Sequence, residues 1–323
     1  MNERFYEILK RFRKRSILVI GDMMLDKYIW GSVNRISPEA PVQVVNVQKE
    51  NYVPGGAANV ASNIASLDAK AYMVGLVGND SARNALLSEL RKIKVDVIGV
   101  VAVSKTPTIQ KVRILGQNQQ LLRVDYEKKE DIDHKSGMEI IKRASKIISR
   151  VDAVVISDYA KGVITKDTAK HIIEIAKKER KIIVVDPKPA HKDFYKNVSL
   201  ITPNYAEAAL MSNSEQEGDN SAIIGKKLLE ELNSTILITK GEKGMSLFEK
   251  NGKITNIPTK AKEVYDVTGA GDTVVAVISL ALASGATIKE AAILANHAAG
   301  IVVGKVGTST VTVDEIKKSL ENE

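Results

Sequence analysis

A glycine-rich turn followed at once by an aspartate is the part of this sequence best suited to chemistry. It lies in DVTGAGDTVVA, residues 266–276, where an apolar helical stretch begins directly after the turn. Glycine lets a ligand approach the backbone closely, and the first N–H groups of a helix lack intrahelical partners. Gly269, Ala270 and Gly271 therefore predict an anion hole for a transferring phosphoryl group, with Asp272 as the base that takes a hydroxyl proton. The alternative is that Asp272 only complements the helix dipole.

Two segments in the first sixty residues place polar side chains where a polyol could bind. Asp22 follows the first buried strand, in GDMMLD, and Asn59 lies in the first turn of a helix after the tight turn Gly55–Gly56. A carboxylate accepts hydrogen bonds from sugar hydroxyls, and an amide both donates and accepts them. We therefore predict that Asp22, Gly55, Gly56 and Asn59 hold a sugar. The structural alternatives are a loop cap for Asp22 and a polar first-turn residue for Asn59.

Two motifs in the second half suit a nucleotide and its metal. NYAE at 204–207 has the spacing of a helix capping box, and the functional interpretation places Glu207 near a magnesium ion, through its carboxylate and bound waters. TKGEKG at 239–244 joins two strands, either as a plain hairpin turn or as a phosphate or ribose contact at the sheet edge. The predicted nucleotide-binding residues are Asn204, Thr239, Lys240, Gly241, Gly244 and, in the last predicted helix at about 288–303, Asn296.

The composition argues against several other kinds of chemistry. The 323 residues include no cysteine, and the four histidines have no metal-binding spacing, so thiol catalysis and zinc sites are not expected. GIVVGK at 300–305 misses the P-loop pattern by one residue. The charge of +8 comes from lysines spread along the chain, and aromatic residues make up 4%, so we expect no nucleic-acid partner.

The hydropathy pattern predicts a cytoplasmic protein without a membrane partner. No apolar run approaches the roughly 20 residues that span a bilayer. The N-terminal segment MNERFYEILKRFRKRS is charged and lacks the apolar core of a signal peptide.

The elements that must position these residues alternate between strand and helix over most of the chain. With helices between most of them, buried strands are predicted at 16–22, 71–78, 152–157, 181–186, 198–202 and 235–239. This alternation predicts a parallel sheet covered on both faces. Strands at about 28–49 and 96–124 lack intervening helices, so we expect them to form a small β-sheet lid inserted into a single domain spanning 1–323.

Four motifs in this order resemble the ribokinase-like (PfkB) carbohydrate kinases, and the resemblance extends over almost the whole chain. They are GGAANVASNIA (55–65), NYAE (204–207), TKGEKG (239–244) and DVTGAGDTVVA (266–276). The resemblance implies an α/β fold, a three-layer α/β/α sandwich with a mainly parallel central sheet and a β-sheet lid. It also implies ATP as phosphate donor, Mg²⁺ as its metal, and a homodimer formed through the lid.

Within that family the chain is similar to kinases of D-glycero-β-D-manno-heptose 7-phosphate. The similarity lies in GDMMLDKYIWGSVNRISPEAPV (21–42), SDYAKGVIT (157–165) and VDPK (185–188), among other segments. It implies transfer of the γ-phosphoryl group of ATP to the anomeric hydroxyl, which gives the 1,7-bisphosphate. Other acceptors stay open, such as a fructose phosphate, ribose or a nucleoside, as does a catalytically silent sugar-binding protein.

A phosphorylated acceptor needs cations to hold its distal phosphate. Lys161 and Lys188 each follow a buried strand, at the sheet edge where Asp22 is expected, and Arg123 lies in the proposed lid. Most lysines are solvated surface residues, which is the alternative for both. The further predicted substrate-binding residues are Lys161, Asp186, Lys188 and Arg123.

Overall fold

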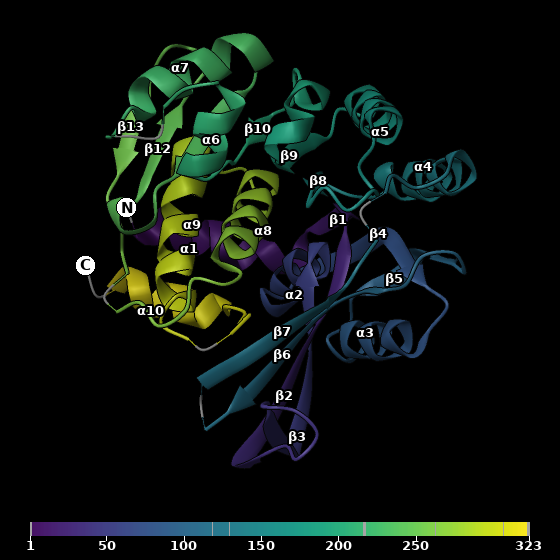
Figure 1. The fold of residues 1–323 in the computed structure, drawn as a ribbon. Helices are drawn as coiled ribbons and strands as arrows, with labels where there is room; N and C mark the ends of the chain where they lie inside the picture. Colours follow the sequence, from purple (N-terminus) through teal and green to yellow (C-terminus); the bar gives the residue numbers. More distant parts are fainter. Residues whose placement is uncertain are drawn as a thin grey trace.

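The main body is one mixed sheet covered by helices on both faces (Figure 1). The structure is a computed structural model that describes residues 2–117, 119–128, 130–215, 218–261, 263–305 and 307–321. Within them the sheet has nine strands, in the order β13 (Ile254–Ile257), β12 (Met245–Phe248), β11 (Thr235–Thr239), β10 (Leu200–Ile201), β9 (Ile182–Asp186), β8 (Ala153–Ser157), β1 (Ser16–Gly21), β4 (Lys70–Gly78) and β5 (Asp96–Val103). Neighbours from β11 to β5 are parallel, and β12 and β13 are antiparallel additions at one edge.

The two faces of the sheet carry separate helical layers because successive side chains of a strand point to opposite sides. In β1, Ile17 and Val19 pack in one apolar core, whereas Leu18 and Ile20 pack in the other. The first core includes residues of α1 (Asn2–Arg11), η1 (Phe12–Lys14), α2 (Ala57–Ser66), α3 (Ser81–Lys92), α8 (Ala270–Ala283), α9 (Ile288–Val302) and α10 (Val313–Glu321). The second includes residues of α4 (His134–Ile148), α5 (Lys166–Lys178), η2 (Pro189–Tyr195), α6 (Tyr205–Met211) and α7 (Ser221–Leu232). The predicted three-layer sandwich is confirmed. None of the described helices is long and apolar enough to cross a bilayer.

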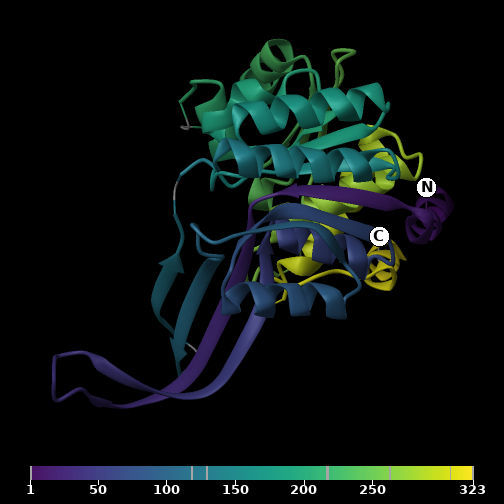
Figure 2. The same cartoon turned by 90° about the vertical axis from the view of Figure 1, so that its right-hand side faces the viewer.

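A second sheet, the lid, stands out from the body (Figure 2). Among the described residues it has four strands, in the order β3 (Gln43–Gly56), β2 (Met23–Ile36), β6 (Ile109–Gly116) and β7 (Gln119–Tyr126). Strand β2 begins two residues after the parallel strand β1 ends, so the lid is attached at the carboxyl edge of the main sheet. That edge is where ligands bind in parallel α/β sheets.

The predicted lid boundaries need two corrections. Residues 96–103 form β5, which pairs in parallel with β4 and belongs to the body. The helix before them, α3, is the crossover that a parallel pair requires, so this segment does follow the alternating pattern. Strands β2 and β3 together cover most of 23–56, which makes the ribbon longer than 28–49. Gly55 and Gly56 end β3, paired with β2, rather than form an isolated turn.

Candidate active site

Asp272 lies at the start of α8, with both carboxylate oxygens oriented by other segments. Gly269 precedes the helix with a φ of 82°, and Asp272 is 4% exposed in the first turn. The carboxylate accepts two hydrogen bonds of 2.7 Å, from Nδ2 of Asn59 to Oδ2 and from the Tyr159 hydroxyl to Oδ1. Asn59, predicted to hold the sugar, is thus brought into the site with its amide bonded to the candidate base.

The surroundings of Asp272 shift the pKa of its carboxyl toward neutral pH. Burial raises the pKa of Asp272 to about 6, and the hydrogen bonds from Asn59 and Tyr159 oppose that rise. Above that pH the carboxylate is ionised and can accept a proton. A base with a pKa close to the working pH combines the correct charge state with sufficient basicity.

Gly269 is required by both its conformation and its surroundings. The φ of 82° lies in the left-handed region that favours glycine. A β-carbon at this position would lie 2.8 Å from Nδ2 of Asn59, the atom that donates to Asp272. Next to it, a β-carbon on Gly271 would meet no atom within 4 Å. The turn therefore supports the base on one side and leaves open space on the other.

A cavity of about 160 Å³ lies beside Asp272 at the carboxyl edge of the parallel strands. The segments after β8, β9, β10 and β11 meet there because parallel strands end at one edge. Besides the glycine turn, its lining includes Tyr159, Asp186, Lys188, Asn204, Glu207 and Thr239. Burial, with Asp272 and Glu207 nearby, raises the pKa of Asp186 well above its usual range. The cavity is thus rich in carboxyl groups.

Asn204 and Glu207 form the capping box that the sequence offered as one interpretation, and both also line the smaller cavity. The Glu207 N–H donates to Asn204 Oδ1 at 2.9 Å, and the Asn204 N–H donates to Glu207 Oε2 at 3.0 Å, which is a reciprocal capping box. The other carboxylate oxygen of Glu207 forms an ion pair with Lys188 in the cavity. The cap fixes Glu207 through one carboxylate oxygen, and the other oxygen faces the cavity.

A second, more apolar cavity of about 390 Å³ adjoins the first and suits an adenosine group. The two share Thr239, Gly271 and Val274 in their linings. The predicted residues Gly241, in the short helix η3 (Gly241–Lys243), Gly244 and Asn296 also line it. Asn296 donates to the Pro258 carbonyl at 2.6 Å. Lys240 is not among the lining residues; its ammonium lies 3.3 Å from Asp219.

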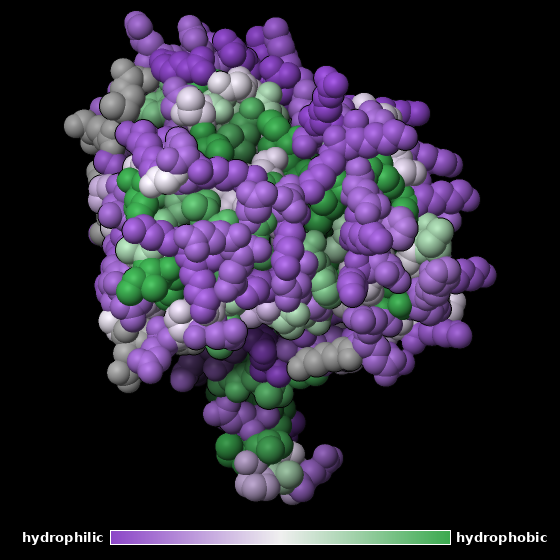
Figure 3. Space-filling model, turned by 90° about the horizontal axis from the view of Figure 1, so that it is seen from above, coloured by the Kyte–Doolittle hydropathy of each residue, from purple (hydrophilic) through white to green (hydrophobic). Residues whose placement is uncertain are grey.

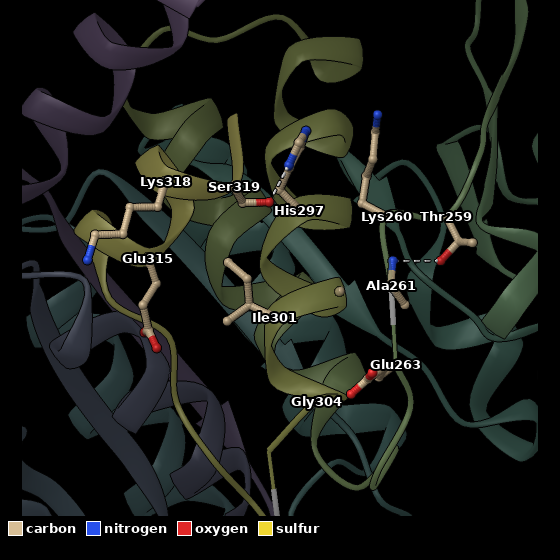
Figure 4. Close-up of a pocket in the computed structure, with 11 residues that line it drawn as sticks. Thr259, Lys260, Ala261, Glu263, His297, Ile301, Gly304, Glu315, Lys318 and Ser319 are labelled. Atoms are coloured by element: carbon tan, nitrogen blue, oxygen red, sulfur yellow. Dashed lines mark hydrogen bonds between the residues drawn. The ribbon is translucent and has the colours of Figure 1, made fainter. Parts of the chain in front are cut away.

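A larger and more open hollow of about 1040 Å³ lies on another side of α9, between α10 and the residues 259–261 and 263 (Figure 4). Lys260 and Glu263 line one side, and Glu315 and Lys318 the other. It shares Thr259, Ala261 and Gly300 with the adenosine-sized cavity but contains no residue of the glycine turn. We therefore place the chemistry in the two smaller cavities.

Asp22 is fully buried and holds the segment that presents Tyr159. Its carboxylate accepts from the backbone N–H groups of Tyr159, Lys161 and Val163 at 2.9, 3.1 and 3.0 Å. Burial raises its pKa to about 6, against these hydrogen bonds. The geometry agrees with the loop-cap interpretation of Asp22, because these bonds hold the segment that carries Tyr159.

Paired cations lie where the lid faces the body. Arg113 lies 2.5 Å from the buried carboxylate of Asp26 and 5.2 Å from the centre of the Tyr28 ring. Lys161, after β8, lies 2.8 Å from the carboxylate of Glu127. Arg123 is directly opposite Arg113 across β6 and β7, but it is half exposed and bonded to Asp125 of its own strand. Among these cations, Arg113 and Lys161 are the more buried.

Sequence reasoning missed Tyr159 and a buried cluster that supports it. The Asp158 carboxylate accepts from the Tyr195 hydroxyl at 2.5 Å and lies 2.7 Å from Nδ1 of His191. These contacts join the segment after β8 to η2, which follows Lys188. The sequence did contain a signal for Tyr159, which lies at the end of a buried strand. It contained no signal for the cluster, because His191 and Tyr195 are 33 and 37 positions from Asp158.

The residues present fit a magnesium ion that is held mainly by its nucleotide. Glu207, Asp186 and Asn204 supply oxygen donors, the kind that Mg²⁺ prefers, around the smaller cavity. Within the part of the chain that the structure describes, no group of three or more His, Asp or Glu side chains could hold a metal alone. A metal with few protein ligands and several phosphate or water ligands is the usual arrangement for Mg²⁺.

The model of the pfkB family carbohydrate kinases matches residues 14–315. The chain belongs to the pfkB family of carbohydrate kinases. Members of this family are phosphotransferases that act on a sugar hydroxyl, which agrees with a base, an anion-binding turn and two adjoining cavities.

Relatives of this pfkB-family chain include proteins described as "Bifunctional protein HldE". Those of Actinobacillus succinogenes and Aliarcobacter butzleri are each 44% identical, over 96% and 94% of this chain. The chain spans 64% of the length of these relatives. Arabidopsis thaliana ribokinase, solved with ribose and ATP, has 20% identity and a TM-score of 0.74, covering 95% of this chain and 99% of its own. Escherichia coli phosphofructokinase-2, solved with potassium, has 18% identity and a TM-score of 0.77, covering 95% and 98%. These two structures support the fold.

Proposed function

We propose that this chain transfers the γ-phosphoryl group of ATP to the anomeric hydroxyl of D-glycero-β-D-manno-heptose 7-phosphate. The observation that carries the kinase assignment is the position of Asp272, bonded to Asn59 and Tyr159 and adjacent to Gly271, where the two cavities meet. The choice of heptose is supported by the 44% identity to HldE proteins over most of this chain and by the segments that resemble heptose 7-phosphate kinases.

The proposed reaction uses the two cavities in sequence. Adenosine occupies the more apolar cavity, and the phosphate chain passes Gly271 into the smaller cavity beside Asp272. The acceptor oxygen attacks the γ-phosphorus, the bond from that phosphorus to the bridging oxygen breaks, and ADP leaves with the electron pair. Asp272 takes the hydroxyl proton, and N–H groups at the start of α8 stabilise the phosphoryl oxygens.

Magnesium is proposed to be held by the nucleotide phosphates and by Glu207, with Asp186 nearby. When bound, it neutralises part of the charge on the phosphates. In the protein itself, Glu207 is fixed for this role by its capping bonds with Asn204.

The phosphate of the acceptor is proposed to lie under the lid, against Lys161 and Arg113. Both cations are already paired, with Glu127 and Asp26, so a phosphate would compete for them. Lys161 belongs to the segment that also carries Tyr159, which reaches Asp272. A phosphorylated sugar could thus contact this cation and the base at its two ends.

An acceptor panel tests the function. Purified protein with Mg·ATP would be assayed for ADP release with heptose 7-phosphate, sedoheptulose 7-phosphate, fructose 6-phosphate, ribose and adenosine. We expect a clear preference for heptose 7-phosphate. Turnover with another acceptor alone would retain Asp272 and the fold but discard heptose, and turnover with none would favour the silent sugar-binding protein.

A homodimer through the lid is proposed from the outer face of the second sheet. Tyr52, Leu122 and Tyr126 are 37%, 54% and 50% exposed, and the strand register places them on the face opposite Arg113. Apolar residues also gather on the projecting part of the lid (Figure 3). Exposed apolar faces of this kind mark protein interfaces, and the identical surface of a second copy is the usual partner.

The dimer is tested by Leu122→Lys, with Ile98→Lys as the matched control. Ile98 is 74% exposed on β5 in the body, and β5 belongs to the main sheet rather than to the sheet of the lid. Light scattering after size exclusion should show a dimer for the wild type and for Ile98→Lys, and a monomer for Leu122→Lys. A dimer in all three would reject the lid interface.

A further inference from the structure

We propose that Lys188 is a catalytic residue, whose ammonium group leaves Glu207 and binds the phosphoryl group during transfer. The inference rests on the proposed kinase function. It replaces the expectation that Lys188 holds the distal phosphate of the acceptor.

The position of Lys188 is the first argument. It lines the 160 Å³ cavity together with Gly271 and Asp272. The adenosine-sized cavity meets this one at Gly271. A triphosphate chain that passes from the adenosine-sized cavity into the smaller one therefore brings its terminal phosphate near Lys188. Lys161, by contrast, is bonded to Glu127 and is not among the residues that line this cavity. Two lysines that look equivalent in the sequence therefore occupy different places.

The charge of the cavity is the second argument. Asp186, Glu207 and Asp272 contribute carboxyl groups, and Lys188 is the single basic side chain among its described lining residues. The ionised carboxylate that Asp272 needs in order to act as a base would repel a negatively charged phosphoryl group at short range. A cation directed into the same space offsets that repulsion and can follow the charge that develops as the group is transferred.

Lys188 is also held in place before any ligand arrives. Pro187 and Pro189 flank it and fix the backbone φ on both sides. Its ammonium lies 5.3 Å from the centre of the Tyr159 ring, and the hydroxyl of that ring is bonded to Asp272. A cation over an aromatic face is attracted by the ring quadrupole. The same tyrosine therefore contacts both the base and the proposed phosphoryl-binding cation.

The exchange of partners is chemically reasonable because Glu207 keeps another hydrogen bond. Its Oε2 accepts from the Asn204 N–H at 3.0 Å, and only the contact of the other oxygen with Lys188 is lost. The phosphoryl group offers three equatorial oxygens as acceptors. Lys188 stays protonated throughout, while the hydroxyl proton goes to Asp272 and the electron pair of the broken bond goes to ADP.

The experiment compares Lys188→Met with Lys192→Met. Lys192 is four residues away and is also ion-paired, with Glu231 at 2.7 Å, but it does not line either cavity. The steady-state kinetics would be measured with Mg·ATP and the preferred sugar phosphate. Calorimetry would compare the binding of ADP with that of adenylyl imidodiphosphate, a non-hydrolysable ATP analogue that has a third phosphate group.

We expect Lys188→Met to lower kcat by about 10²–10³-fold, the usual effect of removing one group that stabilises transition-state charge. The KM for the acceptor should stay within about threefold. Affinity for the ATP analogue should fall about tenfold, whereas affinity for ADP, which lacks the terminal phosphate, should be unchanged. Lys192→Met should resemble the wild type in every measurement.

A normal kcat with a raised acceptor KM would overturn the proposal and return Lys188 to the distal phosphate. Equal loss of ADP and analogue binding would also overturn it, provided that the variant is folded by circular dichroism. If Lys188→Met does not fold, Lys188→Gln retains a donor to Glu207 without the charge and carries the same expectations. If the wild type phosphorylates no sugar phosphate, the proposed function fails. The effect of Lys188→Met on the affinity for the ATP analogue, compared with its effect on the affinity for ADP, still decides the role of Lys188.

Discussion

The catalytic edge of the body and the inner face of the lid hold their charged groups in different ways. In the body, Asp22, Asp158 and Asp272 are almost completely buried and accept hydrogen bonds from other segments. In the lid region, Arg113 and Lys161 form ion pairs with carboxylates, and each cation keeps part of its side chain exposed. Buried, fully bonded carboxylates are expensive to move, whereas a cation with part of its side chain exposed can bind a further anion such as a phosphate. The body is therefore preorganised for chemistry, and the lid is suited to binding. We expect changes in the body to lower kcat and changes in the lid to raise KM.

Replacing the base should produce the largest effect. Asp272→Asn keeps the shape of the side chain but cannot accept a proton, so we expect kcat to fall by about 10²–10⁴-fold. Steady-state kinetics with Mg·ATP and the preferred acceptor measure this. A near-normal kcat would show that the body does not supply the base and would remove the contrast with the lid.

The glycine turn gives the next effect, with a matched control elsewhere in the body. Gly269→Ala and Gly252→Ala both place a side chain at a positive φ, of 82° and 83°. Only at Gly269 would the new β-carbon press on Asn59; at Gly252 it meets nothing within 4 Å. We expect similar losses of thermal stability, but a fall in kcat of about 10²-fold for Gly269→Ala alone, because the base is displaced. Equal kinetics in both variants would contradict a requirement for glycine at the base.

Removing one hydrogen bond from the base should have a smaller and pH-dependent effect. The hydrogen bond from Tyr159 stabilises the ionised form of Asp272, so Tyr159→Phe should raise the pKa of that carboxyl above about 6. Activity of the wild type should rise with pH through about 6, and the variant should need a higher pH for the same rise. We expect a kcat loss of about tenfold near pH 6 and less at pH 8.

The pH profile of kcat measures this prediction. Burial also gives Asp22 a pKa of about 6, but its bonds are to backbone N–H groups, including that of Tyr159, which phenylalanine retains. An unshifted profile, or an equal loss at every pH, would mean that Tyr159 acts only by packing.

The lid should show the smallest effect on chemistry and the clearest one on binding. Lys161→Met should raise the KM for a sugar phosphate by about tenfold, because a charged hydrogen bond to the acceptor is lost, with kcat within about threefold. The corresponding sugar without its phosphate should show no such change. A large fall in kcat with an unchanged KM would place Lys161 with the body residues instead.

The glycine turn, the capping box and the alternation of strands and helices could be predicted from the sequence because they depend on neighbouring residues. Gly269 to Asp272, and Asn204 with Glu207, are each set within a few positions by helix-start geometry. The parallel sheet follows from buried strands separated by helices. The edge strand β5 shows the limit of such local patterns. The sequence does not identify the helix before it as its crossover, so the predicted lid wrongly includes β5.

Only the tertiary structure decided what each polar residue contacts. Asn59 and Tyr159 are 213 and 113 positions from Asp272, yet both bond to it. Lys161 and Lys188 follow neighbouring parallel strands and look alike in the sequence, but one is bonded to Glu127 near the lid and the other to Glu207 beside the base. Local sequence determines which side chains reach the sheet edge. The packing of distant segments determines which partner each one meets there, and therefore its charge environment and its role.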